Sequence, residues 1–129
     1  MPMPPGSFFR RFATPAVALV AALTAVAPAA AKQTQVTVSA PAAAPTANVA
    51  WAVTVHVRLR GKPFPKQAYR PTVYVLDRSG MPVATFHGTR VAPGLYRVGV
   101  VFSGPGRWRY VIPDPVNGEW RFVSPAVHR

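Results

Sequence analysis

The sequence predicts an all-β fold: an immunoglobulin-like β-sandwich of about seven strands, preceded by an N-terminal signal-peptide helix. Three observations predict the sandwich. Apolar and polar residues alternate over several short segments, turn residues separate those segments, and sixteen prolines and nine glycines are spread over 129 residues. A proline inside a helix removes a backbone donor and clashes with the preceding turn, so a helical bundle would not tolerate this density. Short strands joined by Pro/Gly turns accommodate it.

The first 31 residues are expected to be a cleavable secretory signal peptide. Arg10 and Arg11 supply a positive start, residues 12–27 form an uncharged run rich in apolar residues, and the small residues 29–31 fit the pattern that signal peptidase accepts. We therefore expect a secreted, periplasmic or cell-envelope protein. An uncleaved membrane anchor is the alternative, but it needs about 20 apolar residues, and this run reaches that length only by including two prolines. The sequence leaves the export route open.

The chain after the signal peptide is divided by its composition. Residues 32–48 are expected to be an Ala/Pro/Thr-rich linker or a frayed edge strand. Within them, residues 40–48 have no periodicity, whereas residues 33–39 alternate as a short edge strand would. The immunoglobulin-like domain is expected over residues 49–129.

The strongest strand signal begins at Val49. Valine, tryptophan or leucine occupies every second position up to Leu59, and the positions between them hold mostly small, polar or charged residues. This two-residue period predicts a half-buried strand with one core face and one wet face. Further strands are expected over residues 71–76, 83–87, 94–102, 107–112 and 119–123. The side chains expected in the core are Trp51, Val53, Val55, Val57, Val73, Val75, Phe86, Tyr96, Val98, Val100, Trp108, Tyr110, Ile112, Trp120 and Phe122.

Four short motifs combine turn glycines or prolines with strand side chains. They are Trp51-x-Val53-x-Val55, Gly61-Lys62-Pro63, Pro93-Gly94-x-Tyr96 and Pro105-Gly106-x-Trp108-x-Tyr110. Through these motifs, residues 51–122 resemble the YtkA-like and FixH-like exported immunoglobulin-like domains of bacteria. The resemblance implies the sandwich fold and an extracytoplasmic module. It implies no catalytic residue, because the motifs consist of turn glycines and core side chains.

The charge of the chain is strongly positive, with 15 Lys and Arg against 3 Asp and Glu. Such a surface attracts polyanions, although an arginine-rich composition is also what a GC-rich genome produces. In an immunoglobulin-like arrangement Arg58, Arg60 and Arg97 are expected to face outward from one sheet, as candidates for contact with a polyanion or a partner. Arginines 107, 109 and 121 are expected on the opposite sheet. With the charge divided and the aromatics mainly inward, specific nucleic-acid binding is not expected.

Metal binding is a second hypothesis. The chain has no cysteine, which excludes disulfides and thiolate metal sites. Histidine and methionine can hold copper, and His56 and His87 are the candidate ligands. They are not at a chelating spacing in the sequence, and solvated surface histidines are the competing interpretation. His128, next to the C-terminus, is expected to be mobile.

An enzyme is not expected. The three carboxylates, Asp77, Asp114 and Glu119, each lie in or beside a predicted turn, and no nucleophile or phosphate-loop motif is present. The sequence therefore favours a non-enzymatic secreted or envelope-associated interaction or structural module without a cofactor. Its expected partners are an envelope protein or an acidic cell-wall polymer, with the membrane involved only if the signal segment stays uncleaved. A periplasmic copper- or other metal-handling domain is the alternative, and the oligomeric state is open.

Overall fold

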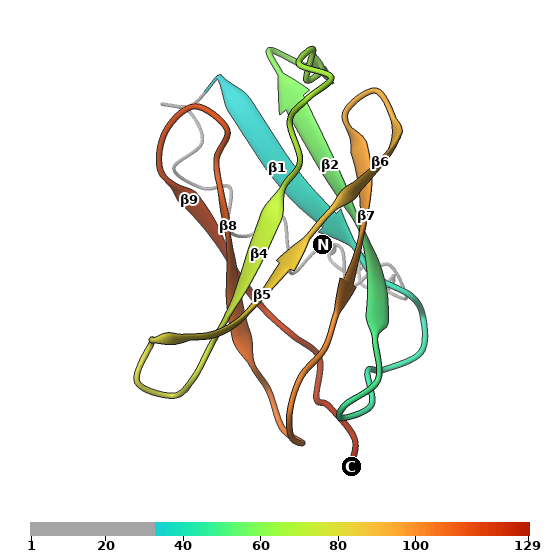
Figure 1. Cartoon of the computed structure of the whole chain (residues 1–129), viewed down its shortest axis with the longest axis vertical. Coiled ribbons are helices and arrows are strands. Elements are labelled where there is room, and N and C mark those ends of the chain that lie inside the picture. Colours follow the sequence, from blue (N-terminus) through green and yellow to red (C-terminus); the bar gives the residue numbers. More distant parts are fainter. Residues whose placement is uncertain (1–32) are drawn as a thin grey trace, which may run out of the picture.

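The computed structural model describes residues 33–129, and this part of the chain is all-β (Figure 1). The expected signal peptide of residues 1–31 lies outside the described residues. The strands are β1 (Thr34–Ser39), β2 (Trp51–Leu59), β3 (Lys62–Pro63), β4 (Thr72–Leu76), β5 (Pro82–His87), β6 (Thr89–Ala92), β7 (Leu95–Val100), β8 (Arg109–Pro113) and β9 (Glu119–Val123). In residues 33–129 no helix has the length and apolar character needed to cross a bilayer.

The strands form two antiparallel sheets that pack face to face as a β-sandwich. Sheet 1 has the order β1-β2-β7-β6, with β3 also paired to β2. Sheet 2 has the order β5-β4-β8-β9. Neighbours in these orders are often distant in sequence, so the chain crosses repeatedly between the two layers. The predicted sandwich of short strands is therefore confirmed at the level of two packed antiparallel sheets.

Strand β2 buries every second side chain from Trp51 to Val57, as predicted. Trp51, Val53, Val55 and Val57 are at most 5% exposed, whereas the residues between them are half-buried or exposed. On β7 the facing positions are also buried, since Val53 pairs with Val98 in the ladder. Alternation places every second side chain on the same face, which is why one face of this ladder is apolar and the other wet.

Most of the expected core residues are buried, and two are less buried than expected. Phe86 and Trp108 pack against the core but remain partly exposed. The Trp108 indole N–H donates to the carbonyl of Gly104 at 2.9 Å, which keeps one edge of the ring near the surface. The expected strand from residue 107 begins only at Arg109, so Trp108 precedes the regular ladder of β8.

The core also contains residues from segments that the sequence does not mark clearly. Strand β1 pairs with β2 along its whole length as an edge strand, and its Val36 and Val38 are 0% and 4% exposed. Phe64 and Val127 are buried as well, and so is Phe102, which lies at the end of the expected strand of residues 94–102. The strand within residues 33–39 is therefore an integral part of the sandwich.

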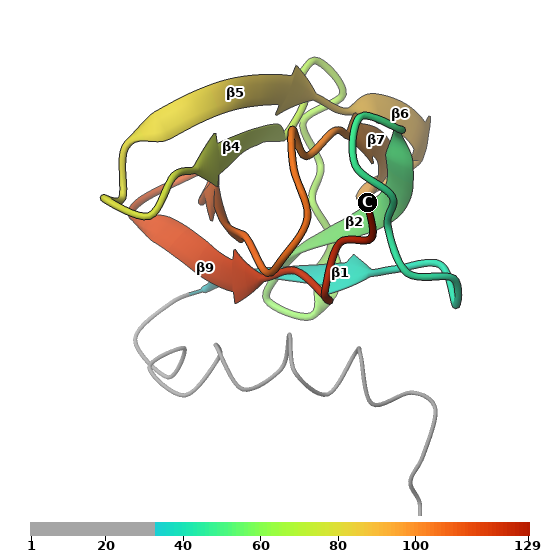
Figure 2. The ribbon, with the colours of Figure 1, turned by 90° about the horizontal axis from the view of Figure 1, so that it is seen from below.

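The two sides of the sandwich are closed differently. On one side β5 of sheet 2 runs through Gly88 directly into β6 of sheet 1, so the chain itself joins the two edges (Figure 2). On the other side, the edge strands β1 and β9 belong to different sheets. There the Thr34 hydroxyl of β1 donates to the Asp114 carboxylate at 2.6 Å, just after β8. The Trp120 indole of β9 donates to the same carboxylate at 2.9 Å.

Candidate functional site

The structure places the two candidate metal ligands on opposite faces of the sandwich. His56 points outward from β2 in sheet 1, and His87 points outward from β5 in sheet 2, where its Nδ1 lies 3.3 Å from the Thr72 hydroxyl. Stacked sheets lie about 10 Å apart, so two outward imidazoles cannot bind the same ion. Within residues 33–129, no cluster of three or more His, Asp or Glu residues has a metal-binding arrangement.

The environment of His56 favours the neutral imidazole. Partial burial lowers the pKa of His56, and the neighbouring Arg58 guanidinium lowers it further.

The main chain of His128 forms two hydrogen bonds with the loop before β2. Its N–H donates to Pro45 at 2.9 Å and its carbonyl accepts from Ala47 at 2.7 Å. These bonds join the main chain of His128 to the loop before β2, and its mobility stays a prediction.

The densest positive charge begins within the last two residues of β2. Over residues 58–70, which we call the basic segment, five cations occur without a single carboxylate. All five side chains are exposed, and within residues 33–129 none forms an ion pair. The segment comprises the last two residues of β2, the β2–β3 turn, β3 and the loop that crosses from sheet 1 to sheet 2. Its cations are Arg58, Arg60, Lys62, Lys66 and Arg70.

The three arginines proposed from the sequence do not act as one group. Arg97 does lie in the same sheet as Arg58, but it pairs with Thr54, four residues away along β2. At a rise of about 3.3 Å per residue this is about 13 Å, more than the Debye length at physiological salt. Arg60 is held in place, since its guanidinium donates to the Gln33 side-chain oxygen at 2.9 Å.

The arginines in and beside sheet 2 also make contacts within the protein. Arg121 forms an ion pair with Glu119 at 2.8 Å. Arg109 donates to the carbonyl of Arg78 at 3.2 Å, and Arg107 reaches the Ser124 carbonyl at 3.5 Å. Arg70 of the basic segment makes similar contacts, donating to the carbonyls of Gln67 at 2.6 Å and Tyr69 at 2.8 Å. The basic segment differs in having five cations and no carboxylate, which makes it the stronger candidate for an external anion.

The described carboxylates have structural roles. Asp77 accepts hydrogen bonds from the Ser79 hydroxyl and from the amides of Ser79 and Met81, which closes the β4–β5 turn and lowers its pKa. Burial raises the pKa of Asp114, but hydrogen bonds from Thr34, Trp120 and two turn amides outweigh it, so the pKa is lowered. These hydrogen bonds favour the ionised form of both aspartates.

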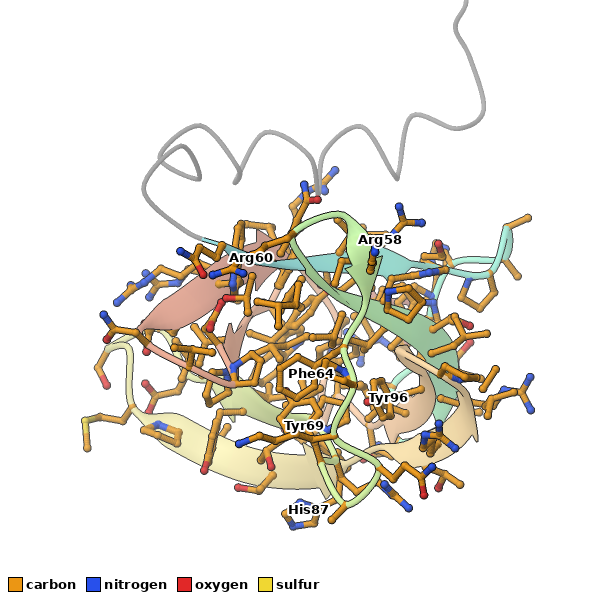
Figure 3. The ribbon with its side chains drawn as sticks, turned by 90° about the horizontal axis from the view of Figure 1, so that it is seen from above. Arg58, Arg60, Phe64, Tyr69, His87 and Tyr96 are labelled. Atoms are coloured by element: carbon orange, nitrogen blue, oxygen red, sulfur yellow. The ribbon has the colours of Figure 1, made fainter. Side chains whose placement is uncertain are left out.

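An aromatic cluster lies beneath the loop of the basic segment (Figure 3). Phe64 and Tyr69 come from the loop, and Tyr96 comes from β7. The ring centroids of Phe64 and Tyr69 are 5.1 Å apart, and those of Tyr69 and Tyr96 are 5.6 Å apart, both edge to face. The hydroxyls of Tyr69 and Tyr96 are buried and have no hydrogen-bond partner. Burial raises the pKa of Tyr69 to about 12, with smaller contributions from Tyr96 and Asp114.

Sequence reasoning did not single out Lys62, Lys66, Arg70 or the aromatic cluster. The run of cations without acids is visible in the sequence, so the basic segment had a signal of its own. The aromatic cluster had none, because Phe64 and Tyr69 lie in a loop without periodicity. No protein-family model matches the chain, and a search of curated proteins finds no match.

Proposed function

We propose that this protein is an exported, non-enzymatic β-sandwich that binds an acidic cell-wall polymer or an acidic envelope protein through its basic segment. One observation carries the proposal: five exposed cations occur within the thirteen residues 58–70, and none forms an ion pair in residues 33–129. Exposed cations without internal counterions are free to attract an external polyanion, with an affinity that falls as salt rises.

The immunoglobulin-like description belongs to this proposal. Strand orders β1-β2-β7-β6 and β5-β4-β8-β9 can be aligned with the order of an immunoglobulin-type sandwich, with β1, β2, β7 and β6 taken as strands A, B, E and D. This alignment and the motifs around Gly94 and Gly106 support kinship with the YtkA-like and FixH-like exported domains. Export itself is supported by the residue pattern of positions 1–31.

The non-enzymatic part of the proposal is supported by the state of the acidic groups. Both aspartates are stabilised as ions by hydrogen bonds, and Glu119 lies 2.8 Å from the Arg121 guanidinium. General acid–base catalysis requires groups whose pKa values lie near the working pH. The lowered pKa values of Asp77 and Asp114 move them away from it.

The test is retention of the purified protein on a phosphocellulose matrix along a salt gradient. Lys62→Ala, Lys66→Ala and Arg70→Ala are combined in one variant. The matched control combines Arg78→Ala, Arg107→Ala and Arg129→Ala, which removes the same charge from exposed positions outside the basic segment. We expect the first variant to elute at a clearly lower salt concentration than the control. Equal elution of the two variants would mean that net charge alone governs retention, and the proposal would fail.

A further inference from the structure

The outward face of sheet 1 carries side chains in rows that run across its strands. Neighbours directly opposite each other in an antiparallel pair have Cβ atoms about 4.5–5.5 Å apart, so the register defines each row. The middle row consists of Thr37, His56 and Leu95. The row on one side consists of Gln35, Arg58 and Pro63, and the row on the other side of Ser39, Thr54, Arg97 and Thr89. All of these residues are half-buried or exposed.

The two outer rows each contain one arginine. Arg58 and Arg97 are exposed, and within residues 33–129 neither forms an ion pair. Arg97 pairs with Thr54, so the two arginines are separated by about 13 Å along β2 at a rise of about 3.3 Å per residue. None of the residues in these rows is a carboxylate. The face therefore offers two separate contacts for anionic groups, joined by neutral side chains.

The neutral side chains of the rows favour a sugar polymer over a protein as the partner. Protein interfaces are enriched in tyrosine, tryptophan, phenylalanine, methionine and arginine. Apart from the two arginines, the rows contain none of these residues and consist mainly of threonine, serine, glutamine and histidine. A threonine hydroxyl both donates and accepts a hydrogen bond, and so does a neutral imidazole, which matches a sugar hydroxyl. Burial and the Arg58 charge lower the pKa of His56 and so favour its neutral form.

We propose that the outward face of sheet 1 binds an acidic polysaccharide that lies along β2 between Arg58 and the row of Arg97. The two guanidinium groups contact separate acidic groups of the polymer, and Thr37, Thr54 and His56 exchange hydrogen bonds with its hydroxyls. This inference rests on the proposed function and narrows its partner to a hydroxyl-bearing polymer. Arg58 also belongs to the basic segment, so the face and that segment adjoin.

Fluorescence anisotropy with two labelled polymers, polygalacturonate and polyglutamate, tests the proposal. Both carry carboxylates, but only polygalacturonate carries sugar hydroxyls. One variant combines Thr37→Val, Thr54→Val and His56→Val and is measured at about pH 8, where imidazole is neutral, so that every charge is retained. Its Kd for polygalacturonate should rise about tenfold, because several hydrogen bonds are lost. Its Kd for polyglutamate should stay within about twofold of the wild-type value, because attraction between charges is unchanged.

Arg97→Gln provides a second test of the same face. It should weaken binding to polygalacturonate at low salt about threefold. Arg78→Gln is the matched control, because it removes the same charge from the exposed β4–β5 turn, outside sheet 1, and should weaken binding less. Valine suits exposed strand positions, and thermal unfolding of each variant checks that it is folded. Equal weakening by Arg97→Gln and Arg78→Gln would contradict the assignment of Arg97.

The two polymers also define the results that would overturn the proposal. These are no binding of polygalacturonate by the wild type, unchanged binding in the three-valine variant, or an equal loss for both polymers in that variant. Tighter binding of the wild type to polyglutamate would indicate an acidic protein partner instead. Failure of the proposed function is a different result, in which the Lys62→Ala, Lys66→Ala, Arg70→Ala variant elutes from phosphocellulose with its control. The three-valine variant retains all of those cations, so the two failures are distinguishable.

Discussion

The Thr34 hydroxyl donates a hydrogen bond of 2.6 Å to the carboxylate of Asp114, across 80 residues of sequence. Thr34 begins β1 and is 4% exposed, and Asp114 follows β8 and is 8% exposed. The same carboxylate accepts from Trp120 and from the amides of Val116 and Asn117. One ionised group thus joins the first strand of sheet 1 to the β8–β9 turn of sheet 2.

Replacing Thr34 by valine should destabilise the fold. The substitution keeps the branched shape but removes a buried donor to a charged acceptor, a hydrogen bond worth about 1.5–3 kcal/mol. Urea unfolding measures the loss. Thr37→Val on the same strand is the control, because Thr37 lies on the outward face opposite His56 and should change the unfolding free energy little. Equal effects at both positions would contradict the role assigned to this bond.

The Asp114 carboxylate should make stability depend on acidity. Its pKa in the fold is below the ordinary value of 3.8, so the folded state holds the ionised form more strongly than the unfolded chain does. This contribution is fully present above that ordinary value and is lost as the pH falls through the lower folded pKa. We expect the wild type to lose stability below about pH 4.

The Asp114→Asn variant tests whether this carboxylate causes the loss of stability in acid. Its unfolding free energy should be lower than that of the wild type at pH 7 and should fall less steeply in acid. Asp77→Asn is the comparison, since Asp77 also has a lowered pKa but lies in an exposed turn. If Asp114→Asn retained the acid dependence of the wild type while Asp77→Asn lost it, the assignment to Asp114 would be wrong.

Phe102 should contribute more stability than the larger Trp108. Phe102 is 0% exposed, and its ring centroid lies 5.8 Å from Trp51 and 6.1 Å from Trp108. Truncating a fully buried phenylalanine to alanine costs about 3–5 kcal/mol through lost burial and the remaining cavity. Trp108→Ala removes a ring that already contacts water, so its effect on the unfolding free energy should be smaller. A larger effect at Trp108 in denaturant unfolding would contradict this ranking.

Gly94 should tolerate alanine less well than Gly80. Both have positive φ, 68° and 90°, where a side chain is disfavoured by about 1–2 kcal/mol. An added Cβ at Gly94 would also lie 2.7 Å from the Val57 carbonyl oxygen and 3.0 Å from Pro63, whereas Gly80 has open space. Thermal unfolding of the two alanine variants measures the cost of this added contact. Equal decreases of the unfolding midpoint would contradict the prediction, because they would mean that the chain around Pro63 moves to accommodate the Cβ.

The sequence predicts those strands whose burial pattern depends only on neighbouring residues. Alternation along β2 depends only on neighbouring residues and on the pleat, so the buried positions from Trp51 to Val57 follow from the pattern. Phe64 lies between two prolines in a loop, and nothing in its neighbourhood indicates that it is 5% exposed. Its burial depends on how the loop crosses from one sheet to the other, which is a property of the whole fold.

The candidate site is likewise predicted from the sequence only in part. The cations of residues 58–70 are countable in the sequence, but their lack of ion pairs is visible only after folding. Conversely, His56 and His87 have suitable chemistry, and only the strand order places them on opposite faces. The unsatisfied hydroxyls of Tyr69 and Tyr96 require knowledge of the surroundings of both rings, which residue spacing does not contain.

The bond between Thr34 and Asp114 also constrains the order of assembly. A ribosome makes the amino-terminal strand first, yet that strand gains its buried partner only when the chain has been made beyond residue 114. Until then β1 can pair with β2 but the two layers stay unjoined on that side. Folding should therefore finish late and slowly, as expected for proteins dominated by contacts between distant residues.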